Sequence, residues 1–172
     1  MIVEMKINSK ALKFGDNINT DIIIPGKYLT ITDEKEMGKH AMDGIDPKFA
    51  EKSRGGTVLV VGKNFGSGSS REQAPIALKN ADVKCVVAKS FARIFYLNAI
   101  NIGLPVLECS DLWADVQDGD LLSVTLEEGT IKNSRSGKVF KAQPLPPFIL
   151  EIIQSGGLLN QLKQKQTTKK NK

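Results

Sequence analysis

Three short apolar runs in the middle of the chain constrain its fold more than any other feature. The runs TVLVVG (57–62), VKCVVA (83–88) and LPVLE (104–108) have the length and the residue types of buried strands. Two segments of helical character, 72–80 and 90–103, separate them. Strands and helices that alternate in this order form parallel pairs joined by helical crossovers. The sequence therefore predicts a parallel α/β unit at the centre of the molecule.

The second helical segment, 90–103, shows both of its ends in the sequence. Ser90 is the predicted N-cap, because a serine hydroxyl can accept a hydrogen bond from a free N–H group of the first turn. Gly103 is the predicted end. One face of the helix is expected to carry Phe91, Ile94, Phe95 and Asn98.

The segments on either side of this unit are expected to be rich in strands. Residues 2–14 alternate apolar and polar, which predicts a strand or a hairpin. Residues 120–143 contain turn signals at Gly129 and Gly137 and predict a β-meander, and a short helix is expected after the next pair of prolines. Since no repeat or low-complexity linker divides the chain, we expect one α/β domain over residues 1–162.

The net charge of +5 arises at the end of the chain. Residues 163–172 contain five of the 24 basic residues and no acid, so the remainder has 19 basic against 19 acidic residues. A protein that binds nucleic acid carries its basic residues clustered on the folded surface. We therefore expect no nucleic-acid partner, and we expect residues 163–172 to form a basic, disordered tail.

Composition also limits the cofactor and the compartment. The chain has two cysteines, Cys85 and Cys109, whose spacing matches no metal-cluster motif, so no metal site is expected in it. The first residues mix charges and lack the apolar run of a signal peptide. No run approaches the ~20 apolar residues of a membrane helix. We expect a cytoplasmic protein with no membrane contact.

The stretch NFGSGSSREQAP, residues 64–75, is the strongest candidate for a functional site. It leads into a predicted helix, whose first turn has unpaired N–H groups. Its glycines let the backbone approach a ligand, and Arg71 supplies a fork of donors suited to a carboxylate or a phosphate. Its sequence matches none of the patterns of a dinucleotide-binding fingerprint, a P-loop or a hydrolase nucleophile elbow. An anion site is the favoured interpretation, and a serine-capped helix with Arg71 paired to a surface acid is the alternative.

Three segments resemble the markers of one enzyme family. GKNFGSGSSREQAP (62–75) is similar to the signature NFGxGSSREHAP, and NTDIIIPGKYL (19–29) and AKSFARIFYLNAINIGLPVLE (88–108) resemble the other two markers. The resemblance covers about residues 3–160. By it the chain is identified as a member of the aconitase/isopropylmalate isomerase family, as the small, swivelling subunit. It implies a single swivelling β/β/α three-layer α/β domain, as in the C-terminal domain of aconitase.

The resemblance also implies a hydro-lyase of two kinds of subunit. A separate large subunit is expected to carry a four-iron four-sulfur cluster, so this chain itself binds no cofactor. The heteromer would remove and re-add water on a small hydroxy-dicarboxylic acid, with iron as the Lewis acid. Ser69 is implied as the catalytic base and Asp21 as a buried catalytic acid near the cluster, with turn capping as the alternative for Asp21. Ser70 and Arg71 are implied as binders of a substrate carboxylate.

The loop at 28–31 is implied to contact the substituent that distinguishes the substrates of the family. The loop consists of Tyr28, Leu29, Thr30 and Ile31. A homoaconitase-like loop would offer an arginine to pair with an extra carboxylate, and this loop has none. An unpaired carboxylate against Leu29 and Ile31 would be costly. The loop therefore favours an isopropyl group, as in leucine biosynthesis, and would also accept a smaller one, as in 2,3-dimethylmalate. Alternatively, Leu29 and Ile31 face the core.

The sequence departs from the signature at two positions, and two other functions remain possible alternatives. Gln73 stands at the usual histidine position and cannot titrate, which puts a proton relay there in doubt. Ser67 replaces a frequent cysteine. The chain could instead be an independent module that binds a small phosphorylated ligand, or a purely structural partner subunit.

Overall fold

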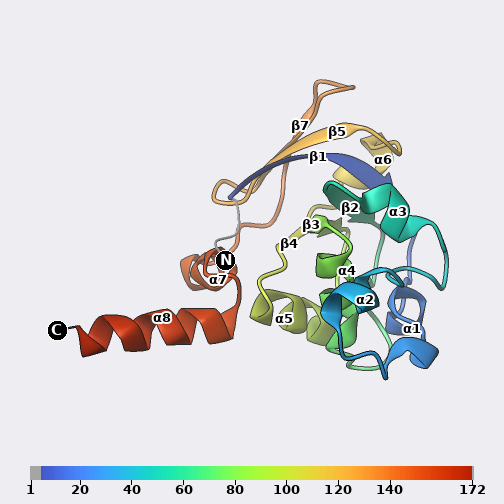
Figure 1. Ribbon diagram of the computed structural model, residues 1–172. Coiled ribbons are helices and arrows are strands. Elements are labelled where there is room, and N and C mark those ends of the chain that lie inside the picture. The colour runs from blue at the N-terminus through green and yellow to red at the C-terminus, as the bar shows by residue number, and fades with distance from the viewer. Residues whose placement is uncertain (1–4, 172) are drawn as a thin grey trace.

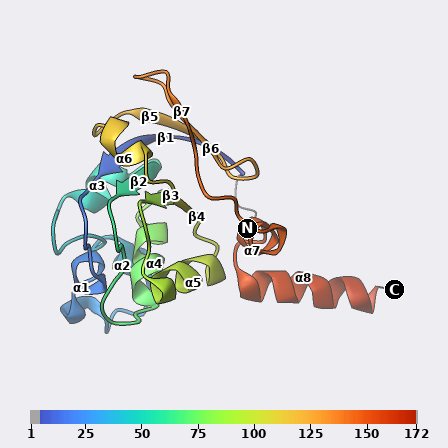
Figure 2. The same ribbon diagram turned by 180° about the vertical axis from the view of Figure 1, so that it is seen from behind.

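The computed structural model describes residues 5–171 and shows a mixed α/β fold built on one seven-stranded sheet. The strand order is β4-β3-β2-β1-β5-β6-β7. The strands are β1 (Lys6–Lys13), β2 (Thr57–Val61), β3 (Val83–Ala88), β4 (Val106–Glu108), β5 (Leu121–Thr125), β6 (Thr130–Asn133) and β7 (Val139–Lys141). Figures 1 and 2 show the sheet curling over the top of the molecule, with most of the helices below it.

The helical elements are short, apart from the last one. They are α1 (Thr20–Ile23), the 3-10 turn η1 (Gly26–Tyr28), α2 (Glu34–Gly38), α3 (Phe49–Ser53), α4 (Gln73–Asn80), α5 (Arg93–Asn101), α6 (Leu112–Asp115), α7 (Pro147–Gln154) and α8 (Leu158–Lys170). No helix in the part of the chain that the structure describes is long and apolar enough to span a membrane.

The parallel half of the sheet confirms the α/β unit that the sequence predicts. Strand β2 pairs in parallel with both β1 and β3, and β3 pairs in parallel with β4. Helices α4 and α5 form the crossovers. All five residues of β2 are buried, as expected for a strand that is covered on both faces.

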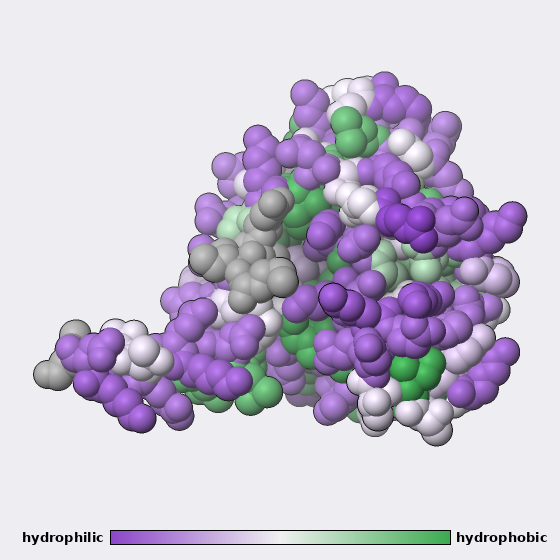
Figure 3. Space-filling view, viewed as in Figure 1, coloured by the Kyte–Doolittle hydropathy of each residue, from purple (hydrophilic) through white to green (hydrophobic). Residues whose placement is uncertain are grey.

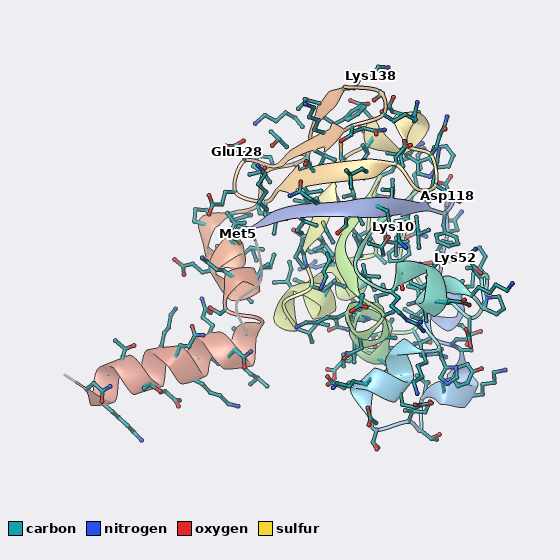
Figure 4. All side chains as sticks on the ribbon, turned by 45° about the horizontal axis from the view of Figure 1, so that its top comes forward. Met5, Lys10, Lys52, Asp118, Glu128 and Lys138 are labelled. Atoms are coloured by element: carbon teal, nitrogen blue, oxygen red, sulfur yellow. The ribbon has the colours of Figure 1, made fainter. Side chains whose placement is uncertain are left out.

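The antiparallel half confirms the predicted meander. Strand β5 pairs with β1, β6 pairs with β5, and β7 pairs with β6, all antiparallel. Gly129 and Gly137, the predicted turn residues, have positive φ angles of 66° and 71°. In Figure 4, Met5 and Asp118 lie near opposite ends of β1, and Lys138 marks the tip of the hairpin between β6 and β7.

The sheet lies between two apolar cores. Successive residues of a strand point to opposite faces. Leu59 and Val61 of β2 accordingly belong to the core between the sheet and helices α1 to α5. Val58 and Val60 belong to the second core, on the other face of the sheet. Leu122 in β5 packs in that second core, so the antiparallel strands curl over the parallel ones. The expected order of three layers, β on β on α, is confirmed.

The start of α5 differs from the prediction. The helix begins at Arg93, and Ala92 rather than Ser90 is its N-cap residue. The Ser90 hydroxyl instead accepts a hydrogen bond from the Asn64 N–H at 2.9 Å, so it caps a loop that lies 26 residues away in the chain. Ile94, expected on the buried face, is 52% exposed, and the helix buries Phe95, Ala99 and Ile100.

The end of the chain also differs from the prediction. Residues up to Lys170 continue helix α8, where the charge pattern predicted a disordered tail. The segment has no glycine or proline and is rich in Leu, Gln and Lys, which favour helix. Figure 1 shows α8 extending away from the body, and the hydropathy surface in Figure 3 is largely hydrophilic along it. The predicted domain boundary after residue 162 falls inside this helix.

Candidate active site

Backbone hydrogen bonds hold the segment 64–72 against the segment that precedes α1. The Gly66 N–H donates to the Ile18 carbonyl at 2.8 Å, and the Thr20 N–H donates to the Ser67 carbonyl at 2.8 Å. Asn19 and Ser67 form an isolated parallel bridge. Two of the three family-like markers are therefore side by side, although about 50 residues separate them in the sequence.

The third marker lies on the other side of the same segment. The Phe65 N–H donates to the Ser90 carbonyl at 3.1 Å, and the Ala92 N–H donates to the Phe65 carbonyl at 2.9 Å. The Phe65 ring meets the Phe95 ring edge-on, with centroids 5.0 Å apart. The segment between β2 and α4 is thus fixed from both sides, which limits the backbone motion of the candidate site.

Gly66 is required where this segment passes α5. Its φ angle is +84°, and an added Cβ would lie 2.3 Å from the Cβ of Phe95. No side chain fits there, because Phe95 is only 2% exposed and cannot move aside. The glycine thus has a packing role in this structure, which differs from the ligand approach that the sequence suggested.

Arg71 and Asp21 meet at the centre of the candidate site. Nη1 of Arg71 donates to Oδ1 of Asp21 at 3.1 Å and to the Ile24 carbonyl at 3.1 Å. The Gly26 N–H also donates to Oδ1 of Asp21, at 3.1 Å. Nε and Nη2 of Arg71 make no hydrogen bond to any residue in 5–171, so one edge of the guanidinium keeps its pair of donors. Arg71 is therefore oriented by the bonds of Nη1, and 21% of its side chain is exposed.

Asp21 lies on the surface of this chain when the chain stands alone. Its side chain is 69% exposed, and the burial near a cluster that the resemblance implies stays a prediction. Hydrogen bonds from Arg71 and from the Gly26 N–H hold the pKa of Asp21 below its ordinary range. The carboxyl group is therefore ionised at neutral pH, and this chain alone leaves it open to solvent.

Ser69 and Ser70 lie on the surface beside Arg71. Both residues are exposed, and the Arg71 N–H donates to the Ser69 carbonyl at 2.8 Å, which turns the chain toward α4. Helix α4 begins two residues after Arg71, at Gln73. The positive end of α4 therefore follows the two serines directly in the chain. The structure brings Ser69, Ser70 and Arg71 into one turn next to Asp21, in which the two serines are exposed and Arg71 is half-buried.

The loop at 28–31 is partly buried. Tyr28, Leu29 and Ile31 are half-buried and pack against the core under the sheet, while Thr30 is exposed. The alternative that Leu29 and Ile31 face the core is therefore partly correct. Each side chain contacts the core on one side and is exposed to solvent on the other. The loop therefore keeps part of its apolar surface exposed, and the contact of this loop with a substrate stays a prediction.

Two backbone groups in the site were not anticipated from the sequence. The carbonyl of Ile24 and the N–H of Gly26 both bind members of the Asp21–Arg71 pair. Both residues lie within the marker NTDIIIPGKYL, but only the fold shows that their backbone atoms reach Arg71 or Asp21. Every residue type except proline has the same backbone N–H and carbonyl groups, so the sequence does not indicate which of them contact a site.

The donors of this chain do not fit an iron–sulfur cluster. Cys85 and Cys109 are both buried, and burial raises the pKa of each thiol, which opposes the thiolate form that binds metal. Among residues 5–171, no group of three or more His, Cys, Asp or Glu side chains is placed to hold a metal ion.

Comparison with known proteins identifies the family. The model of the aconitase C-terminal domain matches residues 3–112. The 3-isopropylmalate dehydratase small subunit of Halothermothrix orenii is 52% identical over 159 residues, which cover 92% of this chain and 96% of that protein. The isopropylmalate/citramalate isomerase small subunit of Methanocaldococcus jannaschii is 51% identical over 159 residues, which cover 92% of this chain and 95% of that protein.

A solved structure agrees with these relatives. The crystal structure of a 3-isopropylmalate dehydratase from Methanocaldococcus jannaschii matches with a TM-score of 0.91 and 44% identity, over 96% of this chain and 98% of that chain. The likeness therefore extends over the sheet, the helices and the candidate site together. This chain belongs to the family of 3-isopropylmalate dehydratase small subunits, which is built on the aconitase C-terminal domain.

Proposed function

We propose that this chain is the small subunit of a hydro-lyase that interconverts 2-isopropylmalate and 3-isopropylmalate by dehydration and rehydration, a step of leucine biosynthesis. The observation that carries the proposal is the turn Ser69–Arg71, in which both serines are exposed and Arg71 is half-buried. Hydrogen bonds join this turn to the Asp21 marker, and Arg71 keeps one free pair of donors. Near-full-length relatives that are named for this activity support the substrate class.

Arg71 and Ser70 bind one carboxylate of the substrate in this proposal. The free Nε–Nη2 edge of Arg71 has the geometry that a carboxylate matches with two parallel hydrogen bonds. The bond from Nη1 to Asp21 holds the guanidinium plane still, so little side-chain entropy is lost when the substrate binds. The Ser70 hydroxyl is exposed next to it and donates a further hydrogen bond.

Ser69 removes the proton from carbon in this proposal. A serine hydroxyl is far too weak an acid to lose its own proton unaided, so the alkoxide needs stabilisation. The positive end of α4 and the neighbouring Arg71 supply favourable charge at the position of Ser69. Asp21 is ionised beside them, and we assign to it the orientation of Arg71.

The apolar surface of Leu29 and Ile31 receives the isopropyl group. No arginine lies in the loop at 28–31, so a substrate with an additional carboxylate would leave that charge unpaired. A smaller substituent fits the same surface with fewer contacts. One relative at 51% identity is named for both isopropylmalate and citramalate, which makes a methyl-bearing substrate the second candidate.

The proposed active enzyme is a heteromer with a large subunit. This chain has no ligand set for a cluster among residues 5–171, and its candidate site is an open surface. We propose that the large subunit holds a four-iron four-sulfur cluster, whose iron supplies a Lewis acid for the leaving hydroxyl. Closure of the two subunits would bury Asp21 and complete the site.

Replacement of Ser69 by alanine tests the proposal. In the reconstituted heteromer, Ser69→Ala should lower kcat for isopropylmalate by about 10²–10⁴-fold, the usual contribution of a general base. Assembly with the large subunit should be unchanged by size-exclusion chromatography. Ser110→Ala, at an exposed serine outside the site, serves as the control and should keep full activity. Near-normal turnover by the Ser69 variant would remove this residue as the base.

A further inference from the structure

The ring of His40 lies flat against the ring of Tyr28. The two centroids are 3.9 Å apart and the planes differ by 10°, which is a close stack. His40 is the only histidine of the chain, and it lies outside all three family-like markers. Tyr28 is the first residue of the loop at 28–31. The stack therefore joins this loop to a part of the molecule that has no other role in the site.

His40 is held from several directions. Its N–H donates to the Met37 carbonyl at 3.1 Å, and Nδ1 of its ring lies 3.2 Å from Oδ2 of Asp43. Two residues later, the Met42 N–H donates to the Ile23 carbonyl at 2.7 Å, which ties the segment to α1. Met37 and Met42 are buried. The His40 ring thus offers Tyr28 a fixed surface.

The segment that carries His40 also packs against the helix behind the carboxylate-binding turn. At Gly38, an added Cβ would lie 2.5 Å from the carbonyl oxygen of Asn80, the last residue of α4. Figure 1 shows α2 lying against α4. Since Ser69–Arg71 precedes the other end of α4, one packed unit sets the positions of both this turn and His40.

We propose that His40 is a positioning residue for substrate specificity: by stacking on Tyr28 it holds the loop at 28–31 at a fixed distance from Ser70 and Arg71. This inference rests on the proposed function. Loss of the stack removes one of the contacts that hold the loop, while the core packing of the loop and the hydrogen bonds of the carboxylate-binding turn remain. A branched substituent that uses the full surface of Leu29 and Ile31 then binds less well, and a small substituent is hardly affected.

Two substitutions separate the ring from the hydrogen bond. His40→Phe keeps a ring that stacks on Tyr28 and loses the contact with Asp43, whereas His40→Gln keeps a polar group for Asp43 and has no ring. Lys39→Ala is the matched control, because Lys39 is the adjacent, largely exposed residue and its side chain pairs with Glu36. Kinetics are measured with the reconstituted heteromer on isopropylmalate and on citramalate.

His40→Gln should raise KM for isopropylmalate about three- to ten-fold, the range that corresponds to one aromatic pair. Its kcat, and its KM for citramalate, should stay within about twofold, because the carboxylate-binding turn is intact. His40→Phe and Lys39→Ala should resemble the parent protein on both substrates. Equal losses on both substrates, a fall in kcat without a change in KM, or a normal His40→Gln variant would overturn the inference.

A second measurement uses the full chain alone and does not depend on turnover. Lys27 is exposed and directly precedes Tyr28, so trypsin cleavage after Lys27 reports on the freedom of the loop. Cleavage should be about three- to ten-fold faster in His40→Gln than in the parent protein and unchanged in His40→Phe. Equal rates in all three proteins would refute the positioning role. Faster cleavage of the His40→Gln chain, together with no conversion of isopropylmalate by the parent heteromer, would refute only the proposed function.

Discussion

At the scale of single residues, Arg71 shows which contacts the sequence can predict and which contacts need the structure. Its residue type and its position before α4 predicted a partner of negative charge, with an anionic ligand and a surface acid as alternatives. The structure shows that Nη1 pairs with Asp21, while Nε and Nη2 bind nothing among residues 5–171. The sequence could not predict this division, because the two partners are 50 residues apart and only the fold sets their geometry.

The shape of the Arg71 side chain, beyond its charge, should matter for turnover. Arg71→Lys keeps the positive charge but loses the paired donors, so kcat/KM for isopropylmalate in the heteromer should fall by about 10–100-fold. Arg54→Lys, at an exposed arginine outside the site, should have no effect. Retention of normal kcat/KM by the Arg71 variant would contradict the carboxylate-binding role.

The ionisation of Asp21 should report its contact with Arg71. Because the pKa of Asp21 is lowered in the folded chain, the contact is present at neutral pH and is lost only as pH falls through that lowered pKa. In Arg71→Gln, the pKa should rise toward the ordinary aspartate value of about 3.9. NMR titration of the Asp21 carboxyl carbon in both proteins makes the comparison. Identical titration curves would show that the two side chains do not interact in solution.

Gly66 and Gly119 form a matched pair for testing the packing of the site segment. Both have positive φ angles, +84° and +86°, but a Cβ would clash with Phe95 at Gly66 and would meet nothing within 4 Å at Gly119. Gly119→Ala should lower the free energy of unfolding by about 1–2 kcal/mol, the cost of the left-handed backbone. Gly66→Ala should lower it by about 2–5 kcal/mol, because overpacking adds to that cost. Equal values in urea unfolding would mean that the segment moves away from α5 easily.

At the scale of elements, the strands could be predicted better than the helix starts. The run 83–88 matches β3 residue for residue, because a buried parallel strand is largely apolar; Lys84 is its one exposed residue. Ser90 was predicted as a cap from its residue type, yet its hydroxyl binds the Asn64 N–H and α5 starts three residues later. A serine near a helix can cap any nearby backbone, and sequence alone cannot tell which one.

Helix α8 was missed because the charge of its residues was weighed above their helix propensity. All described residues after Gln161 are exposed, so the helix has little tertiary packing beyond that point. Removal of residues 163–172 should change the thermal midpoint by less than about 4 °C. Removal from Leu158 onward, which includes buried Gln161, should lower it further. A large loss of stability from the shorter truncation would show that the end of α8 supports the fold.

At the scale of the whole molecule, the three layers place the candidate site on an open edge. The parallel strands β2, β3 and β4 all lead into loops at their carboxyl ends, where open α/β sheets bind ligands. The resemblance in the sequence predicted both this architecture and the residues at that edge. It could not predict that Asp21 is 69% exposed in this chain alone, because exposure is set by the fold around the residue.

The measurement that tests the central claim most directly is turnover of a substrate panel by this chain with and without a cluster-bearing large subunit, under anaerobic conditions. The panel contains isopropylmalate, 2,3-dimethylmalate, citramalate and homocitrate. We expect no turnover by this chain alone and, in the heteromer, the highest kcat/KM for isopropylmalate. Turnover confined to homocitrate, or turnover by this chain alone, would contradict the account.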